Sequence, residues 1–234
     1  MQKIYSIINI SIIYIFYLIC IICFNNIFSD PIISSLILNV LIIIGYIIYI
    51  KKKENKIKYS KIDIKNNILM FSIFIILILL SNNISIFLYN HITDTAFNSY
   101  SNLINNTNNI LIIIVSLIIS PIAEEIFFRG IIFKFLRKNF NFILAAILST
   151  IFFTISHGTL IHIVPTILFG ILFCEIYEYT NNILYNIFYH ILYNILIMSI
   201  GAISFIHNIY LIIICGILSL ILLIMYGKYV INYE

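Results

Sequence analysis

The chain has 234 residues, of which 62% are apolar and only 9% are charged, and its formal net charge is +4. A soluble domain normally has about a quarter of its residues charged, so this composition excludes a soluble globular protein. We therefore predict an integral membrane protein, in which most side chains face lipid or one another.

Eight apolar stretches follow one another along the chain, and each is close to the ~20 residues that a helix needs to cross a bilayer. They cover residues 5–24, 32–50, 67–88, 110–136, 141–157, 159–178, 181–200 and 205–226. The first is too long for a signal-peptide core, and no small-x-small cleavage site follows it, so we expect it to remain as a helix. The predicted fold is an all-α, polytopic membrane bundle of about eight transmembrane helices.

The four cysteines all fall inside these apolar stretches: Cys20, Cys23, Cys174 and Cys215. A buried cysteine usually acts as a small hydrophobic residue. Metal or redox chemistry would need polar or positive neighbours, and the first helix offers none around its two cysteines. We therefore assign them no chemical role.

Lysine and arginine are concentrated in two connecting segments, with seven lysines between residues 51 and 65 and three further basic residues between 134 and 138. Basic loops tend to stay in the cytoplasm, and the opposite loops, around Asp30 and over residues 90–109, contain no Lys or Arg. With eight spans, both termini are then also predicted to be cytoplasmic. The 51–65 loop could instead bind lipid headgroups or nucleic acid, but topology alone explains it, and we expect no nucleic-acid partner.

Three ionisable side chains, Glu124, Glu125 and Arg129, lie well inside the stretch 110–136, although each costs about 2.5–3.5 kcal/mol near the bilayer centre. Glu125 and Arg129 are four residues apart on one helical face, so we predict that they pair. Glu124 projects from a different face, which leaves its carboxylate for a group outside the helix. Pro121 removes an amide donor and frees a carbonyl one turn back, so an irregular, hydrated backbone is predicted here.

Two later stretches place polar side chains at the same four-residue spacing. Phe153 is followed by His157, and His190 by Asn194. This spacing projects each pair from one helical face, so a bundle could bring the polar groups of three helices together. The predicted cluster consists of Glu124, His157, His190 and Asn194.

The remaining polar residues are given structural interpretations. A lone intramembrane His or Asn often only hydrogen-bonds across helices. We prefer that reading, or a position at the membrane interface, for His91, His162, Asn186 and His207. Glu175 and Glu178 lie near a helix end that can reach water. The cluster around Glu124 would need several costly coincidences to be structural, so we interpret it as functional.

The three motifs resemble those of the CPBP intramembrane proteases, also called Abi or CAAX prenyl protease 2-like proteins. Glu-Glu-x-x-x-Arg, Phe-x-x-x-His and His-x-x-x-Asn occur in this order over residues 115–200. Gly130 and the Thr180-Asn181-Asn182 turn also look like the family's pattern, where the turn more often reads Thr-Gly-Ser. We accordingly expect variable transmembrane helices over residues 1–109, a catalytic core over 110–204, and a C-terminal helix and tail over 205–234.

The resemblance implies an endopeptidase that cleaves inside a membrane, and the residues suit that chemistry. Glu124 is expected to act as the base, with His157 holding the attacking water or helping to deprotonate it. His190 and Asn194 would donate hydrogen bonds to the oxyanion. Arg129 would neutralise and orient Glu125 behind these groups. Pro121, Phe153 and Gly130 would shape the surroundings.

A metal ion is compatible with the same residues. Glu124, His157 and His190 could hold Zn²⁺ with an open position for water, but the chain contains no His-Glu-x-x-His helix. A metal-free water activated by the glutamate fits equally well, and we prefer it slightly.

We expect a multi-pass protein of a bacterial plasma membrane. Its expected partners are the lipid bilayer and a membrane-anchored peptide or protein substrate. A prenylated protein, a pheromone or a bacteriocin is each consistent with the motifs. The main alternative function is a non-catalytic immunity or scaffold protein of the same fold. An ion or proton carrier ranks lower because the first half contains no second copy of the Glu-Glu motif. A serine protease ranks lowest because no Gly-x-Ser-x-Gly motif occurs.

Overall fold

A computed structural model describes residues 2–52, 64–91, 95, 110–201, 214, 217 and 221. The described part is helical and contains no strand. Its elements are α1 (Gln2–Ile27), α2 (Pro31–Lys52), α3 (Ile64–His91), α5 (Ile110–Ile114), η1 (Val115–Ile119), α6 (Ser120–Glu125), η2 (Ile126–Phe133), α7 (Lys134–Leu136), α8 (Phe142–His157), α9 (Leu160–Thr180) and α10 (Ile183–Gly201). The all-α prediction is confirmed for this part of the chain.

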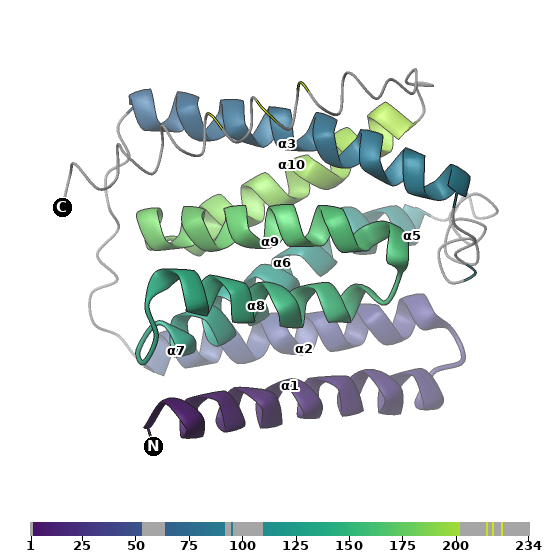
Figure 1. Ribbon diagram of the computed structural model, residues 1–234. Helices are drawn as coiled ribbons and strands as arrows, with labels where there is room; N and C mark the ends of the chain where they lie inside the picture. Colours follow the sequence, from purple (N-terminus) through teal and green to yellow (C-terminus); the bar gives the residue numbers. More distant parts are fainter. Residues whose placement is uncertain are drawn as a thin grey trace.

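The helices form a bundle in which successive long helices alternate in direction, with Ile110–Leu136 counted as one helix (Figure 1). The pair α1 and α2 occupies one side of the bundle and α3 the other, with α8 and α9 between them (Figure 1). The helix from Ile110 to Leu136 comprises α5, η1, α6, η2 and α7, and it contacts α2, α8, α9 and α10. The element that carries the Glu-Glu motif therefore lies inside the bundle.

In the described part of the chain, five helices are long and apolar enough to cross a membrane: Lys3–Ile27, Pro31–Lys51, Asn67–His91, Ile110–Leu136 and Leu160–Thr180. Two further apolar helices, Phe142–His157 and Ile183–Met198, are shorter. These seven helices correspond to the first seven predicted spans. The eighth, over 205–226, lies outside the described residues apart from positions 214, 217 and 221. The membrane class is confirmed, whereas the total of eight spans remains a prediction.

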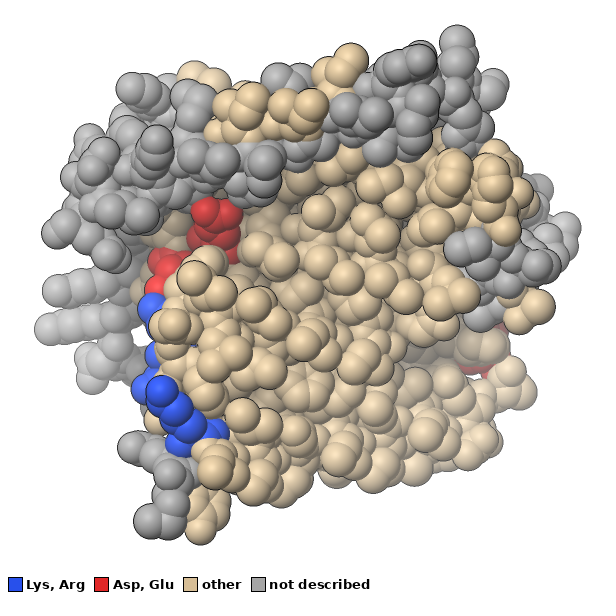
Figure 2. Space-filling model, in the orientation of Figure 1, with Lys and Arg blue, Asp and Glu red and all other residues tan. Residues whose placement is uncertain are grey.

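Many large apolar side chains point outward, while the most polar groups are inside. Phe16 is 66% exposed and Ile143 65%, yet Glu125 and Arg129 are each 0% exposed. On the face shown in Figure 2 the described charged residues gather mainly at one end of the bundle, where Arg137 pairs with Glu178. An apolar exterior with charge at the ends is what a lipid-embedded bundle requires.

Two apolar clusters hold the helices together. The first joins α1, η2, α8 and α9 through residues such as Tyr14, Phe128 and Phe153. The second joins α3, α9 and α10 through residues such as Phe74 and Phe173. The polar groups of the three motifs lie on helices that these two clusters pack together.

The backbone around Pro121 is irregular, as predicted. A π-helical segment, η1, ends immediately before α6, and the N–H of Ser120 bonds to the carbonyl of Val115, five residues back. A second π-helical segment, η2, follows α6 and contains Arg129. Single π-helical turns often occur at functional sites, and here they flank both glutamates.

The Thr180-Asn181-Asn182 turn ends α9. Asn181 has φ of +48°, in the left-handed region. Glycine enters this region without strain and asparagine tolerates it better than most residues. This explains why Asn181 can stand where the resembled family more often has glycine.

Candidate active site

The predicted ion pair between Glu125 and Arg129 is present. Nη1 of Arg129 lies 2.9 Å from Oε1 of Glu125, and both side chains are 0% exposed. Nη2 of Arg129 also donates to the carbonyl oxygen of Gly170 on α9 at 3.3 Å. Glu125 is the last residue of α6 and Arg129 lies in η2. The two side chains meet at a spacing of four residues although η2 is π-helical.

Two aromatic rings surround the Arg129 guanidinium. Its Cζ lies 4.3 Å from the ring centroid of Phe153 and 5.2 Å from that of Phe173. Such cation–π contacts are stronger in a desolvated site than at a surface. Phe153, the first residue of the second motif, therefore helps to bury the cation of the first motif.

His190 connects the two adjacent glutamates. Its Nδ1 lies 2.8 Å from Oε1 of Glu125, and its Nε2 lies 3.7 Å from Oε2 of Glu124. Because the Arg129-paired carboxylate of Glu125 can only accept a hydrogen bond, Nδ1 must carry a hydrogen. His190 therefore presents Nε2 to Glu124, with its ring held between Phe153 and Phe173.

Glu124 differs from its neighbour in exposure. Its side chain is 24% exposed, whereas that of Glu125 is fully buried. The two carboxylates and Arg129 together carry one net negative charge, so a proton on His190 would make the group neutral. Glu125 is thus enclosed by fixed partners, and Glu124 retains an accessible oxygen.

His157 lies beside this group and is partly buried. Its Nδ1 is 2.9 Å from the carbonyl oxygen of Phe153, so this nitrogen carries the hydrogen. Its ring packs edge-on to Phe153 at 4.6 Å, on an aromatic residue that also contacts His190. In its neutral form, His157 therefore has Nε2 available to accept a proton.

Asn194 is held by the π-helical segment η1. Its Nδ2 donates to the carbonyl oxygen of Ser116 at 3.2 Å. The amide group has a second N–H that this bond does not use. One connected cluster is thus formed by four of the predicted residues: Glu124, Glu125, Arg129 and His190. His157 and His190 both contact Phe153, and Asn194 lies on α10 with His190.

Gly130 and Asn186 complete the surroundings. A Cβ at Gly130 would lie 3.3 Å from the ring of Tyr46 on α2, so glycine allows this close approach. Asn186 donates to Oε2 of Glu125 at 3.3 Å. Sequence reasoning gave Asn186 only a role in joining helices, although its position four residues before His190 was an available signal.

The three predicted zinc ligands, Glu124, His157 and His190, are not arranged as a metal site in the described part of the chain. Among the residues that the structure describes, no three His, Cys, Asp or Glu side chains are arranged to hold a metal ion. Glu124 and His190 are close to each other, while His157 bonds to a backbone carbonyl and packs on Phe153. We therefore derive no catalytic step through a metal.

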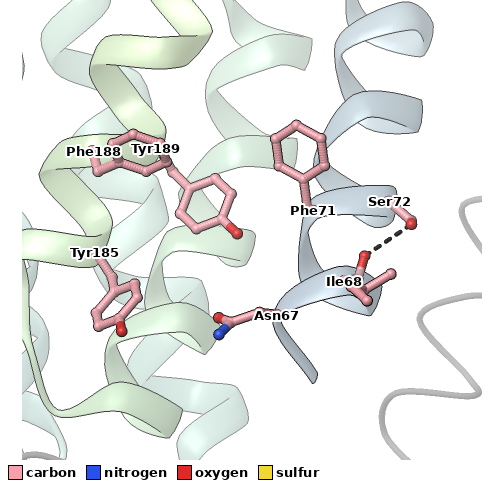
Figure 3. A pocket seen from close by; sticks show the side chains of 7 residues that line it. All are labelled: Asn67, Ile68, Phe71, Ser72, Tyr185, Phe188 and Tyr189. Atoms are coloured by element: carbon pink, nitrogen blue, oxygen red, sulfur yellow. Dashed lines mark hydrogen bonds between the residues drawn. The ribbon is translucent and has the colours of Figure 1, made fainter. Parts of the chain in front are cut away.

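A surface groove lies away from the residues of the three motifs. It is a groove of about 450 Å³ between α3 and α10, in which side chains of the two helices face each other (Figure 3). Its lining consists of Asn67, Ile68, Phe71, Ser72, Tyr185, Phe188 and Tyr189. No motif residue lines this groove, so cavity size does not identify the site in this protein.

The comparisons agree with the geometry. Residues 106–196 match the model of a family described as Type II CAAX prenyl endopeptidase Rce1-like. A Bacillus subtilis protein named "Putative membrane peptidase YdiL" is 42% identical over 73 residues, which make up 31% of this chain and 30% of that protein. No solved structure matches the chain.

The matched segment contains all the residues of the three motifs, from Glu124 to Asn194. The match with the curated relative covers less than a third of either chain. Over its segment 106–196, the chain is therefore similar to the Rce1-like proteins of the CPBP family.

Proposed function

We propose that this protein is an intramembrane endopeptidase in which Glu124 activates a water molecule. The observation that carries the proposal is the placement of a partly exposed Glu124 beside Nε2 of His190, whose Nδ1 is held by the fully buried Glu125. The carboxylate of Glu124 can therefore contact a water molecule, whereas that of Glu125 is bound by Arg129 and His190. The family match and the B. subtilis relative, which is named as a membrane peptidase, support a protease.

The proposed reaction begins with a water molecule between Glu124 and His157. Glu124 accepts a proton from this water, and Nε2 of His157 holds the water or assists the transfer. The water oxygen attacks the peptide carbonyl carbon and forms a tetrahedral intermediate. When the C–N bond breaks, the proton held by Glu124 passes to the leaving amine, so that the carboxylate is regenerated.

The oxyanion of this intermediate needs donors in a site with little water. Asn194 can supply the N–H that is not bonded to Ser116. In the proposed mechanism His190 donates from Nε2 in the form that carries hydrogens on both ring nitrogens, with its Nδ1 held by Glu125. Arg129 holds Glu125 in place through their ion pair.

The substrate that suits this site is a peptide presented from the membrane. The site residues lie on helices whose outward faces are apolar, so a membrane-anchored peptide is the proposed substrate class. A prenylated C-terminal segment fits the description of the matched family. Lipid-anchored or hydrophobic peptides without a prenyl group are the second class to be tested.

The decisive experiment is cleavage of fluorogenic peptides, with and without a prenyl anchor, by the full chain in proteoliposomes. Glu124→Gln and His157→Ala are each expected to lower kcat by about 10²–10⁴-fold, the usual contribution of a positioned acid or base. Glu175→Gln is the matched control because it removes another glutamate from the helices, on α9 outside the site. Cleavage by Glu124→Gln at the wild-type rate would remove Glu124 as the base. No cleavage by the wild-type chain would favour the non-catalytic scaffold function instead.

Metal dependence is tested separately. We expect the purified protein to cleave its substrate after dialysis against a strong chelator, because the proposed mechanism uses only side chains and water. The measurement is metal content by mass spectrometry together with activity before and after chelation. Activity that is lost on chelation and restored by Zn²⁺ would replace this mechanism with a metalloprotease one.

A further inference from the structure

Asn186 lies on the same face of α10 as His190 and Asn194, because the three residues are spaced four apart. It is 0% exposed. Its Nδ2 donates to the backbone carbonyl of Phe173 on α9 at 2.6 Å and to Oε2 of Glu125 at 3.3 Å. A single amide therefore links α10 to α9 and to the helix of the Glu-Glu motif.

The two oxygens of Glu125 have different partners. Oε1 accepts from Nη1 of Arg129 at 2.9 Å and from Nδ1 of His190 at 2.8 Å, whereas Oε2 accepts from Asn186. The terminal torsion of a glutamate is broad and roughly two-fold. Without the Asn186 amide, the carboxylate could turn while it kept its contact with Arg129, and His190 would lose a fixed acceptor.

We infer that Asn186 is a positioning residue for the reaction. By holding Oε2 of Glu125, it keeps Oε1 against Nδ1 of His190 and so aims Nε2 of His190 at Glu124. The inference rests on the proposed function and extends it, because Asn186 belongs to none of the three motifs. Asn186 acts through Glu125 and His190 and does not itself contact the substrate.

A merely structural role for Asn186 makes a different prediction. An amide that only joins helices would lower stability when removed and leave the kcat of the folded molecules unchanged. Asn83 on α3 is the matched control. It is 2% exposed, and its Nδ2 donates to the carbonyl oxygen of Leu79 on the same helix at 2.7 Å.

The kinetic test uses the full chain with Asn186→Ala, Asn186→Asp or Asn83→Ala. Asn186→Ala is expected to lower kcat by about tenfold, the effect of losing one hydrogen bond to a charged group, with KM unchanged. Asn186→Asp should lower kcat further, because its carboxylate repels Glu125. Asn83→Ala should lower only the unfolding temperature. A wild-type kcat per folded molecule in Asn186→Ala would overturn the inference.

A second measurement does not require activity. In ¹⁵N-histidine-labelled protein, the His190 resonances are identified by their loss in His190→Gln, and both Asn186 variants should shift them. Unchanged His190 resonances in both variants would overturn the inference even if peptide cleavage is confirmed. Shifted resonances in a protein that cleaves no peptide would instead contradict the proposed function and leave the positioning by Asn186 intact.

Discussion

A buried guanidinium has to satisfy its charge without bulk water, and Arg129 does so with one carboxylate, one carbonyl and two aromatic rings. Two of these partners also contact other residues of the candidate site. Glu125 also holds His190, and Phe153 also packs against His157 and His190. At the scale of residues, the four-residue spacing of the first motif therefore corresponds to an ion pair that contacts residues of the other two motifs.

This arrangement predicts that Arg129→Met destabilises the protein far more than Arg137→Met. Both arginines pair with a glutamate, but Arg129 is fully buried, and the Arg137–Glu178 pair is 31% and 37% exposed. Breaking a buried pair leaves a buried charge and costs about 3–5 kcal/mol, whereas an exposed pair contributes about 0–1 kcal/mol. Unfolding in mixed detergent micelles measures both variants, and equal losses would contradict the burial argument.

At the scale of elements, the helix from Ile110 to Leu136 is held by segments on both sides of it in the sequence. Asn39 on α2 donates to Oγ of Ser120 at 2.8 Å, one residue before Pro121. Tyr17 on α1 stacks on Phe127 at 4.4 Å. These two helices lie outside the segment 106–196 that matches the family, yet they contact the site helix. They therefore contribute to its position as well as to membrane anchoring.

Gly170 on α9 lies in close contact with Thr150 on α8. A Cβ there would lie 2.6 Å from Cγ2 of Thr150, and the Gly170 carbonyl is the one that accepts from Arg129. Gly170→Ala is therefore expected to force the helices apart and to cost about 1–3 kcal/mol. Gly45→Ala is the control, because nothing lies within 4 Å of a Cβ at Gly45. Thermal unfolding compares the two, and an equally small effect would show that α8 and α9 can separate freely.

At the scale of the whole molecule, the alternating helices place most described basic residues at one end. α1 begins at that end with Lys3, α2 reaches it with Lys51, and α7 and the following turn add three more basic residues (Figure 1). The turn between α1 and α2, with Asp30, lies at the opposite end (Figure 1). The structure thus gathers the basic residues at one end, and the orientation of this end toward the cytoplasm stays a prediction.

The orientation can be measured with single cysteines placed in a cysteine-free chain. A membrane-impermeant maleimide applied to intact cells should label Ser29→Cys, in the turn between α1 and α2, and should not label Lys138→Cys, which follows α7. Both should react after the membrane is permeabilised. Labelling of Lys138→Cys alone in intact cells would reverse the predicted orientation.

Sequence alone determined the membrane class, the first seven helices to within a few residues, and the Glu125–Arg129 pair. These features depend on local composition and on spacing within one helix, which the helical repeat converts directly into geometry. The three motifs also predicted which polar residues make up the candidate site, since polar groups in lipid are costly enough to stand out.

Only the tertiary structure decided which partner each polar group has. Nothing in the spacing of α10 states that His190 bridges two glutamates, that Asn186 reaches Glu125, or that Asn194 bonds to Ser116. These contacts join helices far apart in the sequence, and they depend on how each helix is rotated and how closely its neighbours approach. Side-chain packing between helices sets both the rotation of each helix and the distance to its neighbours. The periodicity of a single helix does not predict either of them.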